Sequence, residues 1–178
     1  MESARMLDPF DLVALEVNDS CPNTGHAKKQ AEVIIENVKA VKSVSRHPII
    51  IKVSVDQDYL AIAYGLKGVA EAISINSVLW SIVFPNGETS PLWKLEKRVG
   101  GGGGGVSGKP AQKHNWKAVE DLAKQGALPV IGPSIMEFSD LDKLRALGAH
   151  AFSFGAIHLR TSWKPTSIVR RDRLCSKR

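Results

Sequence analysis

Residues 12–25 read LVALEVNDSCPNTG, and this stretch decides how the rest of the chain is interpreted. Its first six residues are mostly apolar and suit a short buried strand. Pro22 cannot continue a strand ladder, and the residues after it suit the start of a helix. The stretch therefore predicts a tight turn from strand to helix. This turn displays one thiol, Cys21, and two carboxamides, Asn18 and Asn23, where α/β folds place their active sites.

The same alternation of strand and helix continues along the chain. Further strands are predicted at residues 48–54, 69–78, 128–132 and 149–155, and helices at residues 24–45, 56–68, 115–125 and 139–147. In the last of these helices, Ser139 and Asp142 have the spacing of a capping box. In the second, Tyr64 is expected on the buried face. The order favours an α/β fold with about five parallel strands and right-handed crossovers.

Length and charge indicate one domain with a neutral body. The chain has 178 residues, which is enough to bury a core. The net charge of +6 comes entirely from a basic tail at residues 158–178, with seven basic residues against one acid. Basic and aromatic residues are not interleaved, so nucleic acid is not an expected partner. Residues 79–112 interrupt the rhythm with a glycine run at 100–105 and are predicted to form an inserted loop.

Cysteine content and hydropathy favour a cytoplasmic protein. The two cysteines are far apart, so they predict neither a disulfide framework nor a metal site. No apolar run is long enough to span a membrane, and the N-terminal residues lack the apolar core of a signal peptide. We therefore expect a reduced compartment and no membrane contact.

Polar residues recur at the predicted strand ends, which indicates a ligand site at that edge of the sheet. Lys52 is unusual because it lies inside an apolar run. A buried ammonium needs an anionic or polar partner, whereas a lysine near the strand end can extend its amine to solvent. Both alternatives are open on the residues alone.

The string N-x-S-C-P-N-T-G at residues 18–25 resembles the active-site loop of the dihydroorotate dehydrogenases, which are FMN enzymes on a TIM barrel. The resemblance implies that Cys21 is the base that removes the C5 proton of the substrate. It also implies that Asn18 and Asn23 hold the pyrimidine. Asp19 departs from the apolar residue that is usual in this loop.

Other motifs of the same family imply further site residues. The sequence I-N-S at the third strand end matches the family's substrate site, which implies roles for Asn76 and Ser77. Residues 104–108, GGVSG, match a glycine-rich element beside the flavin, and the last two strand ends match a phosphate grip. The cofactor-binding residues implied by the resemblance are Lys52, Ser107, Gly108, Gly132, Ser134, Gly155 and Ala156.

The implied function is oxidation of (S)-dihydroorotate to orotate with FMN, in pyrimidine biosynthesis. The alternatives are a related flavin-barrel dihydropyrimidine dehydrogenase, and an inactive half-barrel that acts only as an assembly module. The resemblance covers the C-terminal five of the eight strands of the barrel. Without the first three strands, Val53, Ile75 and Val130 are expected to be uncovered. We therefore predict a homodimer that binds FMN weakly.

Overall fold

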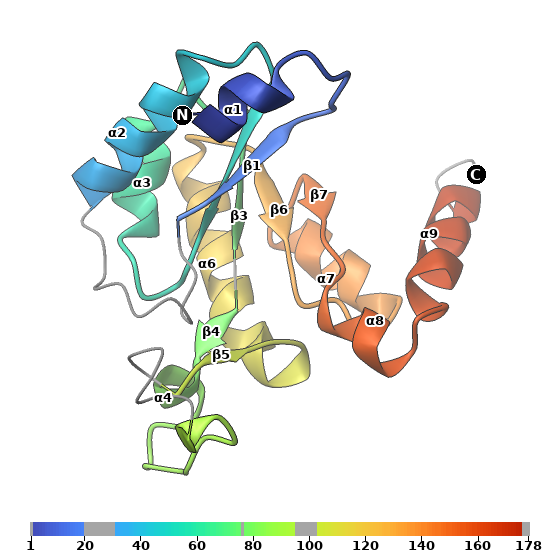
Figure 1. The fold of residues 1–178 in the computed structure, drawn as a ribbon. Coiled ribbons are helices and arrows are strands. Elements are labelled where there is room, and N and C mark those ends of the chain that lie inside the picture. The colour runs from blue at the N-terminus through green and yellow to red at the C-terminus, as the bar shows by residue number, and fades with distance from the viewer. Residues whose placement is uncertain (1, 20–30, 76, 95–102, 176–178) are drawn as a thin grey trace.

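The computed structural model describes residues 2–19, 31–75, 77–94 and 103–175. Five parallel strands and the helices between them make up most of this part of the chain (Figure 1). The elements in chain order are α1 (Glu2–Leu7), β1 (Leu15–Asn18), α2 (Ala31–Lys42), β2 (Ile49–Val53), α3 (Tyr59–Gly65), β3 (Ala72–Ile75), β4 (Val78–Leu79), α4 (Trp80–Val83), β5 (Gly105–Val106), a 3-10 helix η1 (Lys109–Ala111), α6 (Gln112–Gln125), β6 (Val130–Gly132), α7 (Ser139–Ala146), β7 (Ala151–Phe152), α8 (Ala156–Arg160) and α9 (Lys164–Cys175).

The main sheet has the strand order β1-β2-β3-β6-β7, and every neighbouring pair is parallel. The spatial order is therefore the chain order, with no reversal of the kind that defines a doubly wound sheet. Crossovers between parallel strands are almost always right-handed, which places successive helices of such a sheet on the same face. In Figure 1, α2, α3 and α6 lie together along one side of the strands. This is the arrangement of a partial (β/α)8 barrel, as predicted.

The register separates the two faces of the sheet. Val17, Ile51, Ile73 and Val130 form one row across β1, β2, β3 and β6, and the last three are fully buried. Because side chains alternate along a strand, the next row points to the opposite face. That row consists of Asn18, Lys52, Ser74 and Ile131. The helices cover the first face, and the second face is open.

The open face differs from the one that we expected. Val53, Ile75 and Val130 are 0%, 3% and 0% exposed, because they belong to the main core under the helices. The prediction that their side chains would be uncovered is wrong. Among the described residues, the open face instead combines polar side chains with half-buried Ile50 and Ile131.

Three local predictions were also wrong. The first strand begins at Leu15, and Val13 is 95% exposed rather than buried. Tyr64 is 71% exposed, and Ile62 takes the inward position on α3. Ser139 does not cap α7, because the helix begins at Ser139 and no side chain caps its N-terminal residue.

The inserted loop and the tail both contain regular structure. β4 and β5 pair antiparallel as a small second sheet, and α4 and η1 also lie within the described part of the insertion. Within the tail, α9 buries Ile168, and Asp172 accepts hydrogen bonds from Arg145 at 2.6 and 2.7 Å. In the described part of the chain, no helix is both long and apolar enough to cross a membrane.

Candidate functional site

A pocket lies at the carboxyl ends of the parallel strands. Its walls come from β2, β3, α6, α8 and the segments after β3, β5, β6 and β7. The residues that line it are Lys52, Ile75, Ser77, Ser107, Gly108, Asn115, Pro133, Ser134, Ser153, Phe154, Gly155 and Ala156. Seven of the twelve were predicted site residues, so residues spread over more than a hundred positions converge on one cavity. Carboxyl strand ends carry the active sites of essentially all characterised barrels of this kind.

Lys52 lies on the open face and reaches this pocket. Its ammonium Nζ is 2.5 Å from Oε1 of Glu16 on the neighbouring strand. Oε2 of the same carboxylate accepts a hydrogen bond from the hydroxyl of Ser74, at 3.2 Å. The lysine thus has a carboxylate partner, and its side chain, which is 27% exposed, keeps limited contact with solvent. Both of the alternatives drawn from the sequence are therefore partly realised.

Glu16 is a site residue that the sequence reasoning missed. It lies two positions before Asn18, so both side chains project to the open face. An acid at an alternating position in a strand, beside a strand that contains a lysine, was the available signal. The pairing of β1 with β2 was needed to place the two charges together.

Asp19 directly follows β1 and accepts two hydrogen bonds. The Asp19 carboxylate accepts one from Nδ2 of Asn37 at 3.0 Å. The Asp19 carbonyl accepts another from Nε2 of Gln57 at 3.2 Å. The acid that departs from the family pattern thus connects the end of β1 to α2 and to the loop after β2.

Of the predicted catalytic and substrate-binding residues, the structure describes Asn18 and Ser77. Asn18 ends β1 and is exposed, directly across the ladder from Lys52. Cys21, Asn23 and Asn76 lie outside the described residues.

The glycines of the proposed phosphate grip have different surroundings. Gly155 lines the pocket, and a Cβ added there would meet nothing within 4 Å. Gly132 does not line the pocket, and its Cβ would lie 2.8 Å from Cδ2 of Leu144. The structure therefore gives Gly132 a packing role, and its contact with a ligand stays a prediction.

Asn115 is a second lining residue that the sequence reasoning missed. Its Nδ2 donates to the hydroxyl oxygen of Ser134 at 2.9 Å, and the residue is 1% exposed. Its Oδ1 is buried and has no hydrogen-bond partner among the residues that the structure describes. A buried acceptor in this state carries an energetic cost unless a ligand or water supplies a donor. One signal was available in the sequence, an asparagine directly before Trp116, which was predicted to face inward.

The clearest pKa shifts belong to structural contacts. Burial, followed by the hydrogen bond with Asp121, raises the pKa of Tyr59 to about 12. Burial acts to raise the pKa of Glu71, but hydrogen bonds from Lys42 and from the backbone of Ile49 outweigh it and lower the pKa. None of these groups lines the pocket. Among the described residues, no group of His, Cys, Asp and Glu side chains could hold a metal ion.

Comparison with known proteins gives a consistent result. A family model described as dihydroorotate dehydrogenase matches residues 1–158. The catalytic subunit of dihydroorotate dehydrogenase B (NAD(+)) from Thermococcus kodakarensis is 35% identical over 163 residues, which cover 85% of this chain and 50% of that protein. A putative dihydroorotate dehydrogenase A (fumarate) from Solibacter usitatus is 30% identical over 179 residues, or 96% and 56% of the two chains. The catalytic subunit from Desulforamulus reducens is 28% identical over 178 residues, or 94% and 55%. The chain spans about half the length of the curated relatives it matches.

Proposed function

Because the chain belongs to the dihydroorotate dehydrogenase family, we propose that its pocket binds FMN and that it serves the oxidation of (S)-dihydroorotate to orotate. The observation that carries this proposal is the convergence of the implied flavin residues. Six of the seven line one cavity, although their motifs are separated along the chain. This convergence supports a shared ligand, because nothing in the local sequence of each motif requires it to meet the others.

The residues of the pocket suit a ligand with a flat ring, hydroxyl groups and a phosphate. Lys52 supplies a positive charge at one side of the cavity, suited to the electron-rich edge of a flavin. Ser107 and Ser134 supply hydroxyl groups, and Asn115 Oδ1 offers an acceptor to a ligand hydroxyl. At Gly155 the lack of a side chain allows a ligand to approach the backbone. When bound, FMN supplies the acceptor for a hydride from C6 of dihydroorotate.

The proposed proton transfer belongs to the turn after β1. Cys21 removes the C5 proton, and Asn18, Asn23, Asn76 and Ser77 orient the pyrimidine. A free thiol has a pKa of about 8.5, so a thiolate can form near neutral pH where the surroundings favour it.

A second candidate is an assembly module without activity of its own. One observation favours it: in the described part of the chain, one face of the main sheet carries exposed and half-buried residues and no helix covers it. In a complete barrel, the inward side chains pack against each other in layers. A second copy can supply such contacts, and two-fold pairing is the commonest form of association. We therefore also propose a homodimer, which light scattering at micromolar concentration tests.

Flavin titration followed by turnover separates the two candidates. The purified chain is titrated with FMN while flavin fluorescence is recorded, and dihydroorotate oxidation is then measured with a dye acceptor. Saturable binding and orotate formation are expected for the enzyme. An assembly module predicts neither, and turnover of dihydrouracil instead of dihydroorotate would favour a dihydropyrimidine dehydrogenase. Lys52→Met serves as the control, because it removes the pocket's positive charge and keeps a long side chain.

A further inference from the structure

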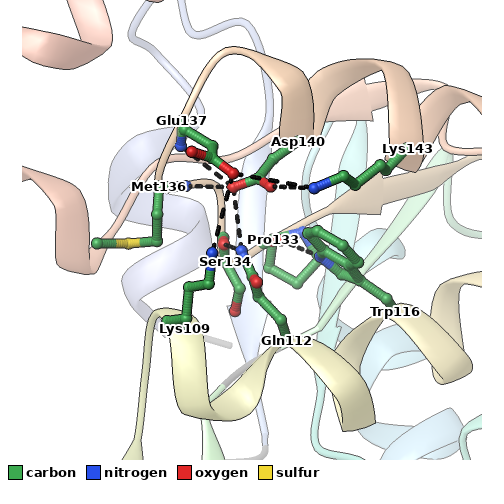
Figure 2. A network of polar contacts seen from close by, with 9 residues as sticks. All are labelled: Lys109, Gln112, Trp116, Pro133, Ser134, Met136, Glu137, Asp140 and Lys143. Carbon is green, nitrogen blue, oxygen red and sulfur yellow. Dashed lines mark hydrogen bonds and ion pairs between the residues drawn. The ribbon is translucent and has the colours of Figure 1, made fainter.

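A fully buried carboxylate lies behind one wall of the pocket. Asp140, in the first turn of α7, is 0% exposed. Its Oδ2 accepts hydrogen bonds from the backbone N–H of Met136 at 2.9 Å and of Glu137 at 3.1 Å (Figure 2). The carboxylate thus fixes the end of the segment that runs from the pocket residue Ser134 to α7. Lys143 lies 3.4 Å from the other oxygen, so the buried negative charge has a positive partner.

Gln112 connects this carboxylate to the pocket wall. Its Nε2 donates to Oδ2 of Asp140 at 3.0 Å and to the carbonyl of Ser134 at 2.9 Å. Figure 2 shows the amide of Gln112 between these two residues. Trp116, on the same helix, donates from Nε1 to the carbonyl of Pro133 at 3.1 Å. Two side chains of α6 therefore bind the carbonyl groups of two consecutive residues of the pocket wall, Pro133 and Ser134.

The residue held in this way has a strained backbone. Ser134 has φ +66°, and it is the one non-glycine residue with positive φ in the described part of the chain. The left-handed conformation is unfavourable for L-residues other than glycine. Such residues persist where surrounding contacts over-determine them, and they concentrate at binding sites. Here the surrounding contacts are those from Gln112 to the Ser134 carbonyl and from Asn115 to its hydroxyl.

The direction of these hydrogen bonds matters for the ligand. Because Asn115 donates to the oxygen of the Ser134 hydroxyl, the proton of that hydroxyl is directed to another acceptor. Ser134 and Asn115 both line the pocket. The serine is thereby set to donate to an acceptor-rich group such as a phosphate oxygen.

We propose that Gln112 and Asp140 are positioning residues that hold Ser134 in its left-handed conformation, so that the pocket wall is shaped for the ligand. Neither residue lines the pocket, so both act through Ser134. The identity of the ligand as FMN rests on the proposed function, whereas the hydrogen bonds and the strain do not.

A double-mutant cycle tests this mechanism with FMN affinity as the readout. Gln112→Met keeps the length of the side chain and removes both hydrogen bonds, so we expect the Kd for FMN to rise about tenfold. In a Ser134→Gly background, glycine adopts positive φ without help. There the same substitution should change the Kd less than about twofold, because coupled residues are not additive. Equal effects in the two backgrounds would overturn the proposal.

A second readout needs no flavin. Amide hydrogen exchange at Met136 and Glu137 should become faster in Gln112→Met, because the Asp140 carboxylate that accepts from both amides loses one of its contacts. Exchange should be faster still in Asp140→Asn, because a carboxamide oxygen is a weaker acceptor than a carboxylate. Unchanged exchange at both amides in both variants would also overturn the proposal. A chain that binds no FMN but shows this change in exchange would refute the proposed cofactor and support the positioning role.

Gln125→Met is the matched control. Gln125 lies on the same helix and also donates one hydrogen bond to a backbone carbonyl, that of Leu60 at 3.0 Å. It does not line the pocket. We expect this variant to leave both FMN affinity and the exchange of Met136 and Glu137 unchanged. A tenfold weaker affinity in this control would show that any lost contact on α6 disturbs the pocket, against a specific role for Gln112.

Discussion

Replacing Gly132 by alanine separates packing from ligand binding. The added Cβ would lie 2.8 Å from Cδ2 of Leu144 and 3.1 Å from Cβ of Ala149, so a neighbour must move. Overpacking of this kind costs roughly 1–3 kcal/mol. For a chain of this size, each kcal/mol lowers Tm by about 2–4 °C. We therefore expect Gly132→Ala to unfold about 2–12 °C below the wild type, with little change in FMN affinity.

Gly155→Ala is the opposite case. Its Cβ would enter open space at the pocket and meet no neighbouring atom within 4 Å. We expect an unchanged Tm and an FMN affinity that falls several-fold, because a methyl group occupies space that the ligand uses. Thermal unfolding is followed by circular dichroism without flavin, and affinity by flavin fluorescence. If Gly132→Ala instead keeps its Tm and loses FMN binding tenfold, the packing argument is refuted and Gly132 contacts the ligand.

Three further predictions concern single side chains. Cys21→Ala should slow dihydroorotate oxidation by about 100-fold or more, the usual effect of losing a general base, and near-normal turnover would exclude this role. Lys52→Met should raise the Kd for FMN by about 10–100-fold, the range for a hydrogen bond to a charged group, and an unchanged Kd would remove Lys52 from the site. Glu71 has a lowered pKa, so its contribution to stability is present above the unfolded-state value and is lost as pH falls through the folded-state value. The urea midpoint should therefore fall less between pH 7 and about pH 3 in Glu71→Gln than in the wild type, and equal falls would contradict this reading.

The sequence was sufficient to predict the five strands of the main sheet and the helices between them, because continuous apolar runs alternate with amphipathic helices, but it did not predict β4 and β5. It was less reliable about which side chains are uncovered. Val53 and its partner Ile75 lie on the helix side, whereas Lys52, the residue before Val53, lies on the open side. The face that a residue occupies is set by strand register, and a shift of one position reverses it.

The residues that line the pocket were predicted best where they belong to a sequence motif of the family. Ser107 and Gly155 were found in this way, and both line the cavity. Gln112 acts from behind the wall, and its partners Ser134 and Asp140 lie 22 and 28 residues further along the chain. No local pattern marks such a contact, because a glutamine in the first turn of a helix is ordinarily solvated.

The strand order described above also bears on how the chain folds. Since each parallel strand pairs with the one that precedes it in the sheet, most pairings close over a single helical crossover or, between β3 and β6, over one insertion. Each of these pairings still joins residues that are distant in the sequence, so a parallel sheet of this kind folds more slowly than a helical bundle. Each new strand can add to the edge of a sheet that already exists. A strand-helix unit can therefore settle on its predecessor as it leaves the ribosome, before the units that follow it have been synthesised.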